Sequence, residues 1–106
     1  MDELDLVFLQ KLCKENKIIW SVHAIERMQE RSIRKSDIIQ VIYNGNIIEQ
    51  YPKSFPYPAC LILGLTINKE NLHVVCGCNG EILKIITAYF PNLEKFDESG
   101  MHRKEK

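Results

Sequence analysis

Residues 72–90, LHVVCGCNGEILKIITAYF, decide the fold because they are typical of two strands joined by a tight turn. Asn79-Gly80 is a strong hairpin signal, since both residues tolerate the positive φ angles that such a turn needs. We predict strands over 72–78 and 81–90, paired antiparallel because the connection is too short for a crossover. The second strand is largely apolar on both faces, which predicts a central position in the sheet.

The sequence before this hairpin predicts two further strands. Residues 60–67 carry leucine and isoleucine at alternate positions, and a polar loop over 68–71 joins them to the hairpin. Residues 47–51 form the first predicted strand. Between the two, prolines keep 52–58 out of an interior strand and predict a loop. Its aromatic residues either cover the core or stack on a base; we favour the first role for Phe55, and Tyr57 suits both.

Helical spacing dominates the first half of the chain. Apolar residues predict a helix over 4–15, followed by the apolar connector Ile18-Ile19-Trp20. Ser21 is a suitable N-cap for a helix ending near Arg31. Ser36 is expected to cap the next helix, which Asn44-Gly45 ends with the glycine in the left-handed conformation.

This order predicts an α+β fold in which N-terminal helices precede a four-stranded antiparallel sheet. The chain has 106 residues, of which 45% are hydrophobic, which suits one domain with a core. We place that domain at 1–91 and expect 92–106, which is charged and aperiodic, to be a frayed tail.

Composition excludes several classes of protein. The formal net charge is zero, so binding of nucleic acid by bulk charge is disfavoured, although a local basic site is not. The absence of a signal pattern or a long apolar run predicts a cytoplasmic protein without a membrane segment. Four cysteines form no C-x-x-C pair, and alternation sets His73 and Cys76 on opposite strand faces. We therefore expect free thiols, no metal and no cofactor.

The helix over 21–31 carries the first candidate site. His23, Arg27 and Arg31 recur every four residues and form one stripe. Imidazole exchanges protons near neutral pH, and two guanidinium groups can hold a phosphate. Arg34 and Lys35 add positive charge beside the stripe. On this pattern alone, however, a solvated helix face with Glu26 and Glu30 pairing to the arginines is the favoured interpretation.

The second candidate site is the polar end of the last strand. Alternation places Thr87 and Tyr89 on one face with Leu83 and Ile85. Thr is common in strands and Tyr often leaves its hydroxyl at the rim of a core, so each residue alone has an ordinary structural explanation. Together, a His, two Arg, a Thr and a Tyr suit metal-free phosphodiester cleavage. The sequence has neither a carboxylate cluster for two metals nor a Gly-rich phosphate loop.

The motifs H-x3-R-x3-R at 23–31 and IITAY at 85–89, in this order, resemble the DUF4258 family of small bacterial domains of unknown function. The resemblance covers about residues 18–91. Asn44-Gly45, 47–52 and 72–75 fit the same pattern, whereas Ser32 stands where the family commonly has Gly. The family is similar to RelE, barnase, EndoU and colicin-type ribonucleases of the BECR fold, with N-terminal helices before a four-stranded antiparallel sheet.

The resemblance implies an active site that contains the helix stripe and the strand end: His23, Arg27, Arg31, Thr87 and Tyr89. It also implies a cytoplasmic endoribonuclease that acts as the toxin of a bacterial toxin–antitoxin pair. The partners would be RNA, contacted also by Arg34, Lys35 and Tyr57, and a zinc-ribbon antitoxin. A non-catalytic RNA- or protein-binding module of the same fold is the alternative. A third is an inert core, in which His23 caps a packing contact and the arginines pair with Glu26 and Glu30.

Overall fold

The computed structural model describes residues 3–91, and these form three helices and five strands in chain order. The first half contains α1 (Leu6–Lys14), β1 (Ile18–Trp20), α2 (Val22–Arg31) and α3 (Lys35–Asn44). The second half contains β2 (Asn46–Tyr51), β3 (Ala59–Leu65), β4 (Asn71–Cys78) and β5 (Leu83–Tyr89). The predicted α+β class is confirmed, and each of the four predicted strands is present. The predicted tail over 92–106 lies outside the described residues.

The sheet has five strands in the order β1-β5-β4-β3-β2, so the prediction of four antiparallel strands is wrong. The additional strand is the segment interpreted as a connector. Ile18–Trp20 pairs in parallel with Leu83–Ile85, and the Leu83 N–H donates to the Lys17 carbonyl at 2.9 Å. A three-residue strand is too short for its alternation to be recognised. All the other pairs are antiparallel, as predicted.

The connection between β4 and β5 explains the strength of the Asn79-Gly80 signal. Gly80 has a φ of +92°, which is favourable only for glycine. The Asn79 side-chain oxygen accepts hydrogen bonds from the N–H groups of Glu81 and Ile82, both at 2.9 Å. Asn and Gly therefore act together to reverse the chain.

A bulge in β5 corrects the predicted faces of its side chains. Cys76 pairs with Ile85 but Val75 pairs with Thr87, so one additional β5 residue is inserted between them. Thr87 and Tyr89 therefore lie on the face opposite to Ile85, not on the same face as predicted. The strand is nevertheless central, since β1 and β4 flank it.

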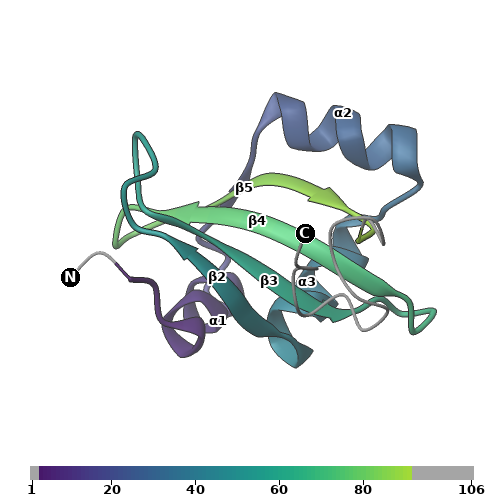
Figure 1. The fold of residues 1–106 in the computed structure, drawn as a ribbon, viewed down its shortest axis with the longest axis horizontal. Coiled ribbons are helices and arrows are strands. Elements are labelled where there is room, and N and C mark those ends of the chain that lie inside the picture. The colour runs from purple at the N-terminus through teal and green to yellow at the C-terminus, as the bar shows by residue number, and fades with distance from the viewer. Residues whose placement is uncertain (1–2, 92–106) are drawn as a thin grey trace, which may run out of the picture.

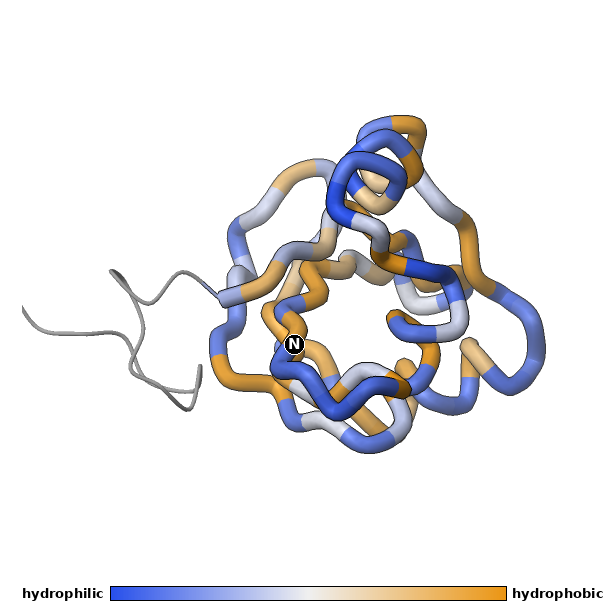
Figure 2. The backbone as a smooth tube through the Cα atoms, turned by 90° about the vertical axis from the view of Figure 1, so that its right-hand side faces the viewer, coloured by the Kyte–Doolittle hydropathy of each residue, from blue (hydrophilic) through white to orange (hydrophobic). Residues whose placement is uncertain are grey.

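One face of the sheet carries the main core. Helix α3 packs against β3 and β4, and α1 packs against α3 and β5. The buried side chains between them include Leu9, Ile38, Ile42, Ile62, Val74 and Ile85. Figure 1 shows α2 apart from these two helices and alongside β5. In Figure 2, α2 is the helix at the top of the view and is mostly hydrophilic.

The ends of α3 differ from prediction. Ser36 is not the cap: Arg34 precedes the helix, and the Asp37 carboxylate accepts a hydrogen bond from the Arg34 N–H at 3.1 Å. Gly45 ends the helix, but its backbone is extended rather than left-handed. Glycine is needed there because a Cβ would lie 2.3 Å from the Leu63 carbonyl oxygen. The Asn44-Gly45 signal thus marked a close approach between a helix and a strand.

Candidate active site

Helix α2 is attached to the sheet through the backbone of β5. The Ser21 hydroxyl caps the helix, as predicted, by accepting from the Ala24 N–H at 2.9 Å. The Ser21 N–H donates to the Ile85 carbonyl at 3.2 Å, and the Ser21 hydroxyl to the Ile86 carbonyl at 3.3 Å. Strand β1 ends opposite Ile85 of β5. Beyond Ile85, α2 takes the place of β1 beside β5. Backbone hydrogen bonding therefore fixes where the helix begins.

The buried face of α2 is narrow and carries two side chains. Ala24 and Met28 are buried, whereas Val22 is 76% exposed. The small Ala24 side chain lets the helix approach the sheet closely at the capped end. As a result, His23 is exposed and Arg27 is half-buried, both beside the contact with the sheet.

Arg31 anchors the other end of α2. Its Nη1 donates to the Ala88 carbonyl at 2.9 Å. Ala88 lies between Thr87 and Tyr89, so the structure brings Arg31 to the strand end that carries both predicted residues. Tyr89 in turn stacks edge-on against His73, with ring centroids 5.3 Å apart. The cross-strand pairing of His73 with Tyr89, which sequence reasoning missed, explains this contact.

The remaining predicted basic residues already have partners. Arg27 forms an ion pair with Glu30, the type of contact expected for a solvated helix face. Arg34 lies 3.4 Å from the Asp37 carboxylate, and the Lys35 ammonium lies 5.1 Å from the centre of the Trp20 ring. Exposed ion pairs are worth little, about 0–1 kcal/mol, so a phosphate can displace Glu30 from Arg27 at small cost.

A cavity of about 300 Å³ adjoins His23. The loop between β2 and β3 forms one wall, and the start of α2 and parts of β4 and β5 complete it. Of the predicted residues, His23 and Tyr57 line this cavity, whereas Arg27, Arg31, Thr87 and Tyr89 do not. Lys84 also lines it and was not predicted, because a lysine in a strand resembles any solvent-facing residue. Phe55, expected to cover the core, is 93% exposed at this cavity.

The predicted site residues thus form two groups along one strand. His23 lies near Lys84 at the beginning of β5, and Arg31 lies near Tyr89 at its end. Tyr89 lies five positions after Lys84 in β5, which corresponds to about 16 Å along the strand. Arg27 is one helical turn from His23 and one turn from Arg31. The two groups therefore flank a continuous strip of α2 and β5.

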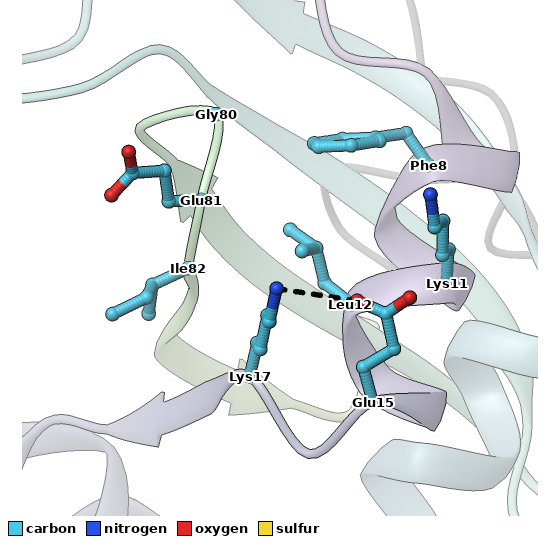
Figure 3. A pocket seen from close by; sticks show the side chains of 8 residues that line it. All are labelled: Phe8, Lys11, Leu12, Glu15, Lys17, Gly80, Glu81 and Ile82. Carbon is cyan, nitrogen blue, oxygen red and sulfur yellow. Dashed lines mark ion pairs between the residues drawn. The ribbon is translucent and has the colours of Figure 1, made fainter.

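A second cavity, of about 450 Å³, has a different chemistry. It lies between α1 and the β4–β5 turn, and Figure 3 shows charged side chains of both signs around it. Lys17 pairs with Glu15 at 3.4 Å. Lys11 and Glu81 are also among its lining residues. Because the charges compensate one another, this cavity does not select for an anionic ligand.

Two buried cysteines, Cys60 and Cys76, have a packing role in the sheet. Cys60 and Cys76 are buried cross-strand partners with sulfur atoms 3.8 Å apart. The contact with Cys60, together with burial, holds the pKa of Cys76 well above its ordinary value, so this thiol is a poor nucleophile at neutral pH. His73 and Cys76 lie on opposite faces of β4, as predicted. Within residues 3–91, no group of three or more His, Cys, Asp or Glu side chains is arranged to hold a metal ion.

These features define a small α+β domain with a histidine- and arginine-bearing helix fixed along an inner strand of its sheet. The model of a family described as a domain of unknown function, DUF4258, matches residues 20–90, and the chain belongs to this family. The match contains both groups of candidate residues. No curated protein and no solved structure matched the chain. None of the helices over 3–91 is long and apolar enough to cross a membrane.

Proposed function

We propose that this domain is a metal-independent endoribonuclease that acts as the toxin of a bacterial toxin–antitoxin pair. The observation that carries the proposal is the exposed His23 beside a cavity that also presents Lys84, with Arg27 one turn further along α2. An imidazole next to cationic side chains provides both proton transfer and stabilisation of phosphate charge. The likeness of the family to BECR-fold ribonucleases is part of the same proposal.

In the proposed reaction, the 2′-oxygen of RNA bonds to the adjacent phosphorus while the bond from phosphorus to the 5′-oxygen breaks. His23 takes the proton from the 2′-hydroxyl or delivers one to the leaving 5′-oxygen, and water carries out the other of these two proton transfers. Arg27 stabilises the charge that builds on the non-bridging oxygens. Arg31, Thr87 and Tyr89 orient the phosphate chain at the other end of the strip. The products are a 2′,3′-cyclic phosphate and a 5′-hydroxyl.

Incubation of purified protein with single-stranded RNA in the presence of a chelator tests this function. The wild type should produce fragments with 2′,3′-cyclic phosphate ends and should leave DNA of the same sequence intact, since DNA lacks the 2′-hydroxyl. His23→Ala should abolish cleavage without changing the midpoint of thermal unfolding, because this side chain is exposed. Undiminished cleavage by the His23→Ala protein would remove the catalytic role from His23.

The second candidate function is a non-catalytic RNA- or protein-binding module. The observation that favours it is that Arg27 and Arg31 already have partners within the protein, Glu30 and the Ala88 carbonyl. This module would bind RNA equally well with and without His23 and would leave the RNA uncut.

The toxin role has its own test. Induced expression of the protein should arrest growth, and co-expression of a zinc-ribbon antitoxin from the neighbouring gene should restore growth.

A further inference from the structure

The cavity beside His23 has an apolar floor and an aromatic wall. Gly77 and Ile86 form part of the floor, where a Cβ on residue 77 would lie 3.3 Å from the Pro58 carbonyl oxygen and 3.5 Å from Ile86. Phe55 and Tyr57 come from the loop between β2 and β3, in which prolines restrict the backbone. The site therefore offers planar, apolar surfaces on a restrained loop.

Phe55 has no structural explanation in the fold. Its side chain is 93% exposed, so it contributes little to the hydrophobic stabilisation of the core. A lone exposed apolar residue is common on protein surfaces, but this one lines a cavity together with a second aromatic residue. Such a pair is well suited to stacking against a flat ligand.

The charge around this cavity has one sign. Lys84 supplies a positive charge, and none of the lining residues is Asp or Glu. This contrasts with the cavity in Figure 3, where lysines and glutamates alternate. A ligand that matches both the aromatic wall and the positive charge is planar at one end and anionic at the other.

We propose that this cavity binds one unpaired nucleotide of single-stranded RNA, with its base against Phe55 and Tyr57 and the adjoining phosphate on Lys84. The volume of about 300 Å³ is at the lower end for ligand sites, which suits one base rather than several. A base inside a duplex cannot present its flat face to these rings, so the nucleotide must be unstacked. The substrate of the domain is therefore single-stranded at this position.

The site deepens the proposed function, since it would hold the nucleotide next to His23, but binding can be measured without cleavage. The probe is a short fluorescent 2′-O-methyl oligonucleotide of mixed sequence, which has no free 2′-hydroxyl to attack the phosphate. Fluorescence anisotropy at several salt concentrations gives its affinity for the whole chain. A duplex of the same sequence should bind at least about tenfold more weakly, since its bases are stacked and paired.

Two substitutions probe the two halves of the site. Phe55→Ala should weaken binding of the single strand by about 5- to 150-fold, the range for loss of one aromatic stacking contact. Lys84→Gln should lower the slope of log affinity against log salt by about 0.7, the value for one phosphate contact on a single strand. Thermal unfolding of each variant checks the fold, and Phe55→Ala should leave it unchanged because that ring is exposed.

The matched control is Lys69→Gln, which changes the charge by the same amount. Lys69 is exposed between β3 and β4, at the opposite end of the sheet from the loop that carries Phe55 (Figure 1). The affinity of the Lys69→Gln protein for the single strand, and the salt dependence of that affinity, should equal those of the wild type. If Phe55→Ala and Lys84→Gln also behave as wild type, the nucleotide site is refuted, whether or not the protein cuts RNA. If both lose binding while wild-type protein leaves RNA uncut, the site stands and the proposed endoribonuclease fails.

Discussion

Arg31 and Arg27 lie one turn apart on α2 but have different energetic roles, which substitution by Met can separate. Met is a good helix former of similar length, so it removes the charge without disturbing helix propensity. Arg31 donates to the Ala88 carbonyl at 2.9 Å and lies in the last turn of the helix. Arg27 is half-buried and, among the described contacts, pairs only with the exposed Glu30.

The contacts of the two arginines predict different costs in unfolding free energy for Arg31→Met and Arg27→Met. A hydrogen bond from a charged donor is worth about 1.5 kcal/mol at an exposed site, and a cation at a helix C-terminus about 0.5 kcal/mol. Arg31→Met should therefore cost about 2 kcal/mol, which lowers the unfolding midpoint by about 8–16 °C in a domain of this size. Arg27→Met loses one surface ion pair and should cost less than about 0.5 kcal/mol, or a few degrees.

Thermal and urea unfolding followed by circular dichroism measure both costs, and RNA cleavage measures the effect on activity. Arg27→Met should retain its stability and, if the proposed endoribonuclease function holds, lose about 100-fold or more of the cleavage rate, as expected for loss of one transition-state donor. Relative to Arg31→Met, Arg31→Lys should recover only the stability that comes from a positive charge at the helix C-terminus. Equal unfolding midpoints for Arg31→Met and Arg27→Met would refute the anchoring role of Arg31.

Three further predictions concern the backbone and Asp37. Ser32 ends α2 with a φ of +56°, so Ser32→Gly should relieve left-handed strain and stabilise the protein by about 0.5–1 kcal/mol, raising the unfolding midpoint; a lower midpoint would contradict this. Gly45→Ala should destabilise by about 3 kcal/mol in urea unfolding, because backbone oxygens of Leu63 and Val41 lie 2.3 and 2.6 Å from the new Cβ. Burial raises the pKa of Asp37, but hydrogen bonds from the Arg34 and Ile67 N–H groups outweigh it and hold this pKa below its ordinary value. The stabilisation from Asp37 is therefore present above its unfolded pKa and lost as the pH falls below about 4, so Asp37→Asn should lose less stability than wild type between pH 5 and pH 3 in parallel unfolding series.

Local patterns predicted the parts of the fold that depend on local chemistry. The Asn79-Gly80 turn and the Ser21 cap each rest on hydrogen bonds between residues at most three apart, so their signals lie within short stretches. Pairing between distant segments leaves no such local signal. Strand β1 was missed for this reason, since three apolar residues become a strand only beside β5.

The candidate site shows the same division between local and long-range information. The helical stripe was predictable from four-residue spacing, but its neighbours were not. A bulge cannot be recognised where Ile85 and Ile86 are both apolar, and one additional residue reverses the face of Thr87 and Tyr89. Lys84 and Phe55 have ordinary local surroundings in the sequence, and only the folded loop and strands bring them to one cavity.

The attachment of α2 to β5 also determines when the candidate site can form during synthesis of the chain. The hydrogen bond from Ser21 to Ile86 joins residues 65 apart, and the one from Arg31 to Ala88 joins residues 57 apart. Contacts of such long sequence separation form late, because a large loop must close first. During synthesis the helix emerges well before the strand on which it rests. A chain released before β5 is complete would carry His23, Arg27 and Arg31 without the strand that supports them, so it should lack the arrangement on which the proposed function depends.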